Sequence, residues 1–361
     1  MQVLKLNIDN FRNIETASLE PHPQINFFIG PNGAGKTSVL ESLVVMAKGR
    51  SFRSGSHKDL IGPAQKQFQL HCQLDYQGKT HHLGVERSAS KWRGRLDGED
   101  VKQRAELARL LPHICIDPDS HLLIDGGPEK RRRYLDWTVF HVKPDFLSIW
   151  VRHFRALKQR NALLKQPETR QSQDILTALD QQLGETAKQI NELRYLAFDQ
   201  LQPFILDVLA EISPGFPPIS LQYSRGWSGG DYAEYLLANR HRDAEAGQTL
   251  GGPHRANIEC LTGKQKSRDI LSRGQQKALS CAMLVAQAEH LLKSHLEPIF
   301  LLDDPESEFD GGALARLFGR VSRHNKQIWI TSVSAELPER PGLANNYAVF
   351  HVKHGRFRKM V

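Results

Sequence analysis

The sequence lacks any long hydrophobic run. No stretch reaches the roughly eighteen consecutive apolar residues that indicate a transmembrane helix. The first residues, Met1-Gln-Val-Leu-Lys-Leu-Asn7, also lack the pattern of a secretory signal peptide. Hydrophobic residues make up 40% and charged residues 24% of the chain, which is ordinary for a globular protein. We therefore expect a cytoplasmic protein that has no membrane partner.

Cysteine is scarce, and no two cysteines form a C-x-x-C pair. The four cysteines are widely separated along the chain: Cys72, Cys115, Cys260 and Cys281. This spacing does not favour a disulfide framework or a zinc site, and it indicates structural thiols. The sequence also shows no internal repeat and no low-complexity tract.

Acidic residues are fewer than basic ones. Lysine and arginine number 48 against 40 aspartates and glutamates, so the formal net charge is +8. This excess permits a polyanionic partner but does not establish one, because many basic proteins bind no nucleic acid. The length of 361 residues predicts two domains, or one domain that carries a large insertion.

One short stretch near the start fits the phosphate-loop pattern G-x-x-x-x-G-K-[ST]. The apolar run Ile25–Ile29 predicts a buried strand before it, and residues Ser38–Lys48 predict a helix that Gly49 ends. In this setting backbone N–H groups can surround phosphates, while Lys36 reaches the β- and γ-phosphates of ATP and Thr37 ligates Mg²⁺. The predicted nucleotide-contacting residues are Gly30, Pro31, Asn32, Gly33, Ala34, Gly35, Lys36, Thr37 and Ser38.

Two basic stretches follow, and each has two interpretations. Lys91–Arg95 predicts a hairpin that either tracks a phosphodiester backbone or, as we favour, is a solvated edge strand. The run Arg131–Arg133 after Gly126-Gly-Pro128 predicts either a phosphate-binding surface or a solvated helix face. Arg12, in the turn Asn10–Asn13, lies near the nucleotide or is an ordinary turn arginine.

The middle of the chain is rich in helix-forming residues. Apolar residues recur at helical spacing from Ile175 to Leu193, which predicts a helix hairpin or a short coiled coil. We expect prolines to break these helices at Pro203, Pro214, Pro217 and Pro218. This block is interpreted as an insertion, because features of a nucleotide site resume after it.

Two later stretches extend the predicted site. Leu271–Lys277 precedes an apolar helix, so Ser272 and Gly274 form a second anion-binding corner at a helix N-terminus. The buried strand Pro298–Asp303 ends in a carboxylate, the usual place for the acid that holds Mg²⁺. Asp304 follows directly.

A phosphate loop, an LSxGQ-type signature and a strand that ends in aspartate, in this order, resemble the ABC-type ATPases. The resemblance implies an α/β ATPase head with a mixed sheet, in which Ser272, Gly274 and Gln275 of one subunit close over the ATP of another. It also implies that Thr37 and Asp303 hold Mg²⁺. Asp304 takes the general-base position, where most of the family has the longer glutamate, so slow hydrolysis is expected.

Within this group the chain resembles the RecF family of bacterial recombination proteins over nearly its whole length. The resemblance rests on the signature Leu271–Lys277, on Leu301–Asp304 and on four further stretches: Asn10–Asn13, Gly49–Arg53, Pro118–Asp136 and Gly252–Arg255. It implies an ATP-dependent homodimer that binds double- and single-stranded DNA and acts with RecR and RecO to load RecA at gaps. Asn257, Pro305 and Phe309 depart from the family pattern.

The change in composition along the chain and the return of nucleotide-site motifs after it predict a domain plan. The expected ATPase head consists of residues 1–136 and 246–361, and the inserted α-helical domain consists of residues 137–245. On the basis of charge alone, we expect these basic residues to contact DNA: Arg50, Arg53, Lys91, Arg93, Arg95 and the helix face from Arg152 to Arg160.

The alternative is the nucleotide-binding subunit of an ABC transporter, which predicts a shorter interval between phosphate loop and signature and a switch histidine that is not apparent here. A chromosome-organising SMC-type head needs far longer coiled-coil arms than this insertion offers. A phosphate-loop kinase or GTPase leaves Leu271–Lys277 unexplained.

Overall fold

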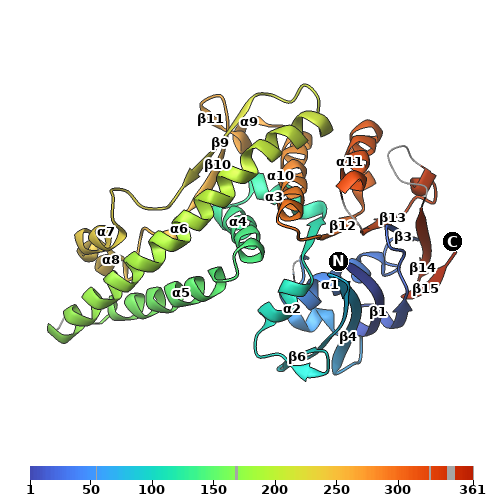
Figure 1. Cartoon of the computed structure of the whole chain (residues 1–361), viewed down its shortest axis with the longest axis horizontal. Coiled ribbons are helices and arrows are strands. Elements are labelled where there is room, and N and C mark those ends of the chain that lie inside the picture. The colour runs from blue at the N-terminus through green and yellow to red at the C-terminus, as the bar shows by residue number, and fades with distance from the viewer. Residues whose placement is uncertain (54, 167–169, 325–326, 340–345, 361) are drawn as a thin grey trace. The chain divides into compact units, whose positions relative to one another are not determined.

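The structure is a computed structural model that describes residues 1–53, 55–166, 170–324, 327–339 and 346–360 (Figure 1). The chain forms two compact units. The first comprises Met1–Ser120, Ile205–Gly215 and Lys277–Val361, and the second comprises His121–Phe204 and Phe216–Gln276. Two of the four boundaries, after residues 204 and 276, fall inside long helices, and the other two follow residues 120 and 215, whereas the expected domain plan placed its boundaries at residues 136 and 245. That plan stays a prediction.

An antiparallel sheet forms one layer of the first unit. Its strand order is β2-β1-β4-β5-β6-β7. The strands are β1 (Gln2–Phe11), β2 (Ile14–Leu19), β4 (Gln67–Tyr76), β5 (Lys79–Ser88), β6 (Trp92–Leu96) and β7 (Glu99–Asp100). Alternate side chains of β1 and β4 are buried, which is the pattern of a sheet with one face on the core. The basic segment Lys91–Arg95 thus overlaps β6, which lies between β5 and the short edge strand β7.

A second, mostly parallel sheet carries the predicted nucleotide-binding segments. Its order is β15-β14-β3-β13-β12-β8, and only β15 is antiparallel. The strands are β3 (Ile25–Ile29), β8 (His113–Ile116), β12 (Ile299–Asp303), β13 (Ile328–Ser332), β14 (Tyr347–Lys353) and β15 (Arg356–Lys359). All residues of β3, β12 and β13 are buried, as expected for central parallel strands.

Helix α1 (Lys36–Lys48) joins the two sheets in one hydrophobic core. Nearly all of its residues are buried, because it packs on apolar side chains of both sheets, such as Leu6 of β1 and Trp329 of β13. Gly49 ends the helix in the left-handed conformation, with φ of 68°, and donates its N–H to the Val45 carbonyl. The first unit also contains α2 (Arg104–Leu110) and α11 (Gly311–His324).

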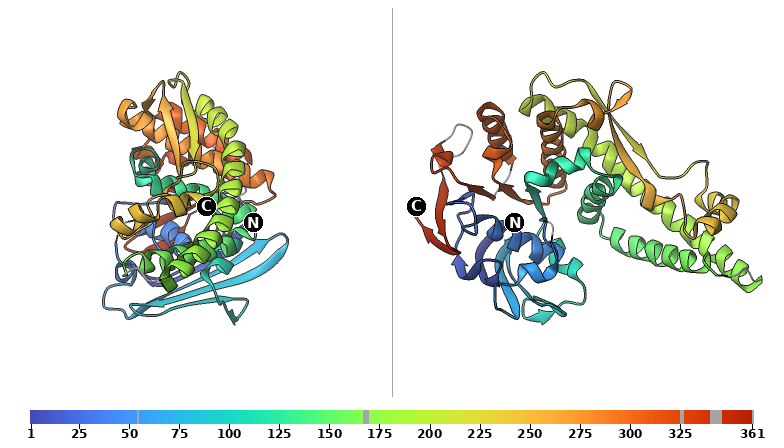
Figure 2. Two further views of the ribbon diagram at one scale, coloured as in Figure 1. Left: turned by 90° about the vertical axis from the view of Figure 1, so that its left-hand side faces the viewer. Right: turned by 180° about the vertical axis from the view of Figure 1, so that it is seen from behind.

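The second unit is built on long helices. Figures 1 and 2 show α5 (Phe146–Leu163) alongside the first part of α6 (Arg170–Ile212). Ala156 and Leu157 of α5 pack there on the apolar stripe that contains Leu179 and Leu183 of α6. The other helices are α3 (Leu122–Asp125), α4 (Pro128–Val142), α7 (Tyr232–Ala238), α8 (Arg240–Ala246) and α9 (Ser267–Ile270), and α10 (Arg273–Lys293) begins here.

One expectation for this region was wrong. Pro203 does not break the helix but lies inside α6. Its ring is exposed, so water can solvate the carbonyl that loses its intrahelical donor, while Leu201 and Ile205 remain buried beside it. The block of residues 137–245 also contains one strand, β9 (Ile219–Ser224), which pairs with β10 (Asn257–Thr262). Strand β11 (Gln265–Lys266) completes a three-stranded sheet.

No helix among the described residues is long and apolar enough to cross a membrane.

Candidate nucleotide site

The phosphate loop connects β3 to α1 with the backbone that its glycines permit. Gly33 and Gly35 have φ of 76° and 111°, which side chains other than glycine rarely adopt. A Cβ atom at Gly30 would lie 2.1 Å from the Val352 carbonyl oxygen, so only glycine fits there. The loop therefore curls at the N-terminus of a long buried helix, where backbone N–H groups favour an anion.

Lys36 lies at the first turn of α1. Its Nζ donates to the carbonyl oxygens of Gly30 at 2.7 Å and Pro31 at 3.0 Å. Burial lowers the pKa of this ammonium group, and the nearby carboxylates of Asp304 and Asp303 oppose that shift. The charged amine thus folds over the loop at the place where phosphate oxygens are expected.

Thr37 and Asp303 lie in direct contact. The Thr37 hydroxyl donates to Asp303 Oδ1 at 2.8 Å, and the Thr331 hydroxyl donates to the same oxygen at 2.7 Å. Burial raises the pKa of Asp303, while these hydroxyl donors and Arg53 lower it. A hydroxyl and a carboxylate side by side are oxygen ligands of the kind that Mg²⁺ prefers, so these residues fit that ion.

Asp304 follows in a strained backbone conformation, with φ of 49°. Its N–H donates to Thr331 Oγ1 at 2.9 Å, and its carbonyl accepts from the Ser307 hydroxyl at 2.8 Å. These bonds turn the chain sharply after β12 and leave the Asp304 carboxylate partly exposed.

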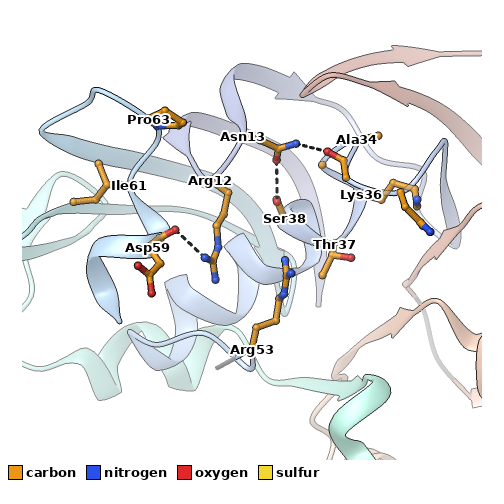
Figure 3. A pocket seen from close by; sticks show the side chains of 13 residues that line it. Arg12, Asn13, Ala34, Lys36, Thr37, Ser38, Arg53, Asp59, Ile61 and Pro63 are labelled. Atoms are coloured by element: carbon orange, nitrogen blue, oxygen red, sulfur yellow. Dashed lines mark hydrogen bonds between the residues drawn. The ribbon is translucent and has the colours of Figure 1, made fainter. Parts of the chain in front are cut away.

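A cavity of about 460 Å³ opens beside the loop (Figure 3). Besides residues 32–38 it is lined by Arg12, Asn13, Arg53, Asp59, Ile61 and Pro63. Its volume lies in the range usual for sites that bind small ligands. Arg12 thus lines the cavity, and this favours the nucleotide-related interpretation of that residue over an ordinary turn role.

Glu41 and Asn13 were not expected from the sequence. The fully buried Glu41 carboxylate pairs with the Arg12 guanidinium at 2.6 Å and also accepts from the Ser51 hydroxyl. Asn13 donates to the Gly33 carbonyl at 2.8 Å and accepts from Ser38 at 3.2 Å, so it ties the middle of the loop to the first turn of α1. Glu41 could have been identified from the sequence, because it is an acidic residue among the apolar residues of α1.

The signature residues lie in the second unit. Ser272 accepts from the Gln275 N–H at 3.3 Å, and the Gln275 side chain accepts from the Ser272 N–H at 2.9 Å. This reciprocal pair caps α10. Ser272 and Gly274 are exposed. The Gln276 side chain lies inward and donates to the carbonyls of Arg268 and Leu271.

The arginines that were expected to contact DNA on the basis of charge differ in their exposure and in their ion-pair partners. Arg160 is fully buried between Asp180 and Asp243, so its nomination was wrong. Arg93 and Arg95 are exposed but share Asp100 as an ion-pair partner.

The residues 2–358 match the family model described as the RecF/RecN/SMC N terminal domain. The chain is 39% identical to the DNA replication and repair protein RecF of Stenotrophomonas maltophilia (strain R551-3), over 99% of both chains. It is 40% identical to the RecF of Xanthomonas oryzae pv. oryzae (strain KACC10331 / KXO85), over 99% of this chain and 98% of the other.

Solved structures agree on the fold. The recombination mediator protein RecF with ATP, of the RecFOR pathway, superposes with a TM-score of 0.87 at 22% identity, covering 100% of this chain and 98% of the other. An Smc head bound to the C-winged helix domain of ScpA gives 0.59 at 14% identity, covering 100% and 97%. The expected α/β ATPase-head fold is therefore confirmed.

Proposed function

The chain belongs to the RecF family, and from this premise we propose that it is an ATP-dependent DNA-binding protein of DNA replication and recombinational repair. The observation that carries the proposal is the contact between Thr37 of the phosphate loop and Asp303 at the end of β12, beside a cavity of about 460 Å³. Family membership does not favour the alternative of an ABC-transporter subunit.

ATP binds with its phosphates on the loop of residues 30–38. Gly33 and Gly35 let the backbone N–H groups face the phosphates, and Lys36 exchanges its carbonyl partners for β- and γ-phosphate oxygens. Thr37 and Asp303 hold Mg²⁺, which neutralises developing charge on the phosphate oxygens when it is bound.

Hydrolysis is slow and serves as a switch. Asp304 is the general base, because it follows the Mg²⁺-holding carboxylate and its own carboxylate is partly exposed. An aspartate reaches one methylene less far than a glutamate, so it positions the attacking water less well. We further propose that DNA stimulates this step.

The active form is a homodimer with composite sites. Ser272 and Gly274 are exposed at the start of α10, and Gln275 caps the same turn. In the proposed dimer they close over the γ-phosphate that the other copy holds. ATP then contacts both copies and stabilises the dimer. Because ATP binds the closed dimer more tightly than the open form, nucleotide binding increases the affinity for DNA.

The DNA partner is gapped DNA with double- and single-stranded parts, and the protein partners are RecR and RecO, in a reaction that loads RecA. The support is the similarity to RecF proteins, one of which is described within the RecFOR pathway. Since phosphate contacts dominate such binding, affinity falls steeply with salt.

The test is fluorescence anisotropy of a labelled DNA duplex with and without ATP and Mg²⁺. We expect ATP to tighten binding by the parent at least about tenfold, and we expect Lys36→Ala to lose this gain. Lys79→Ala, at an exposed lysine of the same unit outside the cavity, is the control and keeps the gain. A parent that binds DNA equally with and without ATP contradicts the proposal.

A further inference from the structure

A small cavity of about 80 Å³ lies in the second unit, away from the phosphate loop. It is bounded by residues of α3, α4, β10, β11 and α9. Its charged lining consists of Arg131, Lys266, Arg268 and Glu259, so three cations face one carboxylate. An excess of positive charge around a cavity of this size indicates an anion.

Arg131 is the buried part of this site. Only 7% of the residue is exposed. Its Nη1 donates to the carbonyls of Leu123, Ile124 and Gly126, and its Nε donates to Asn257 Oδ1 at 2.9 Å. All these acceptors are uncharged, so no carboxylate neutralises the guanidinium directly. Its Nη2 has no hydrogen-bond partner among the residues that the structure describes.

The surroundings make this charge costly. Burial lowers the pKa of Arg131 and the positive charge of Arg268 adds to that effect, while Cys260 and Glu259 oppose it. A buried cation normally has a carboxylate partner, because desolvation is otherwise uncompensated. An anion in the cavity supplies the missing counter-charge and can accept from Nη2.

The other two cations of the cavity lining, Lys266 and Arg268, are exposed to solvent. Lys266 ends β11 and has an exposed side chain with no ion-pair partner in the described part of the chain. Arg268 is also exposed and lies 3.3 Å from Asp269, a solvated pair that contributes little. Both side chains can therefore turn towards a ligand that enters from solvent.

We propose that this cavity binds one phosphate group of a nucleic acid backbone. The cavity has room for a tetrahedral anion or a few waters but not for a nucleoside. Arg131 is a rigid guanidinium of the kind that recognises phosphate oxygens, and Lys266 and Arg268 neutralise the charge. This inference rests on the DNA binding proposed above and assigns residues to it.

The location links the cavity to the signature. Arg268 belongs to α9, and its carbonyl accepts from the Gln276 side chain at 3.0 Å. Leu271, which follows α9, accepts from the same amide at 3.1 Å. A phosphodiester held at Arg268 thus contacts the segment that leads directly into Ser272.

The test compares DNA binding by the parent and by the double variant Lys266→Gln/Arg268→Gln. We expect the variant to bind a labelled duplex about tenfold more weakly, since charge-assisted hydrogen bonds are lost. The slope of log affinity against log salt should also fall by about one in magnitude. The matched control is Lys264→Gln, an exposed lysine of the same hairpin that does not line the cavity and should leave both quantities unchanged.

A second variant tests Arg131 without removing it. Asn257→Asp places a carboxylate against Arg131 Nε and neutralises the site from inside. We expect DNA affinity to fall roughly threefold to tenfold while the melting temperature does not fall, because the new ion pair retains the hydrogen bond. A merely structural cluster predicts unchanged DNA affinity for Asn257→Asp, and that result overturns the inference.

The source of the phosphate is distinguished by a third measurement. Melting temperatures are compared in inorganic phosphate and in chloride at matched ionic strength. If phosphate stabilises the parent but not the double variant, while both bind DNA equally, the cavity takes a free anion and the nucleic acid assignment is overturned.

The two proposals fail in different ways. If the parent itself does not bind DNA, the proposed function fails, whereas equal DNA binding by the parent and the double variant refutes only the cavity inference.

Discussion

Asp304 shows how one residue combines backbone strain with proposed chemistry. Its φ of 49° is uncommon for a residue with a side chain, although aspartate and asparagine adopt it more readily than most. The bond from its N–H to Thr331, which also bonds Asp303, fixes the turn after β12. The same hydroxyl thus positions the proposed Mg²⁺ ligand and the proposed base.

We predict that Asp304→Asn lowers the ATP hydrolysis rate by about a hundredfold or more, because general bases contribute factors of this size. Asparagine tolerates the left-handed conformation, so the fold and ATP binding should remain. Phosphate release under single-turnover conditions measures the rate, and fluorescent-nucleotide binding checks the affinity. A variant that hydrolyses ATP as fast as the parent removes Asp304 from the role of base.

The residues that the sequence predicted for the nucleotide site are those of contiguous motifs. Lys36 and Thr37 belong to one pattern, and Asp303 follows from a strand that ends in a carboxylate. Asn13 and Glu41 were missed because their roles depend on partners distant in the chain, such as the Gly33 carbonyl and the Arg12 guanidinium. Such partners become adjacent only through folding.

Helices α5 and α6 enclose the imidazole of His153, whose lowered pKa makes the stability of this helix pair depend on pH. His153 of α5 is fully buried, and its Nδ1 lies 2.9 Å from the Thr186 hydroxyl of α6. That hydroxyl donates to the Gln182 carbonyl, so the imidazole donates to it. Burial, with smaller effects of His254 and Arg194, lowers the pKa of His153 to about 3.

We predict that acid weakens this packing. The folded state keeps His153 neutral, while the unfolded chain takes up the proton below a pH of about 6.5. Stability is therefore lost as the pH falls from about 6.5 towards 3. Between pH about 7.5 and about 5.5 the free energy of unfolding should fall by about 1 kcal/mol more in the parent than in His153→Gln, measured by urea unfolding.

The control for this measurement is His241→Gln, at an exposed histidine of α8 in the same unit. We expect it to show the same acid loss as the parent. Equal losses in the parent and in His153→Gln exclude His153 as the source.

Helices and strands were predicted correctly from the sequence where the local sequence signal agrees with the packing in the folded protein. Strand β3 and the end of α1 at Gly49 were predicted to the residue, because a buried run and a left-handed glycine are local signals. Helix α6 runs through Pro203 because the apolar stripe on either side stays buried, and tertiary packing overrides the local preference. The alternation in β9 was overlooked beside three prolines.

At the scale of the whole molecule, each half of the proposed catalytic centre lies in a different unit. The phosphate loop and Asp303 belong to the first unit, whereas Ser272 and Gly274 belong to the second. We propose that ATP completes this centre between two copies of the chain.

The most direct test is sedimentation of the purified protein with and without ATP and Mg²⁺. Lys36→Arg and Ser272→Arg are compared with the parent, and Ser148→Arg, at an exposed serine of the second unit, is the control. We predict that ATP doubles the mass of the parent and of the control, while Lys36→Arg and Ser272→Arg stay monomeric. A parent whose mass is the same with and without ATP contradicts ATP-dependent dimerisation through Ser272.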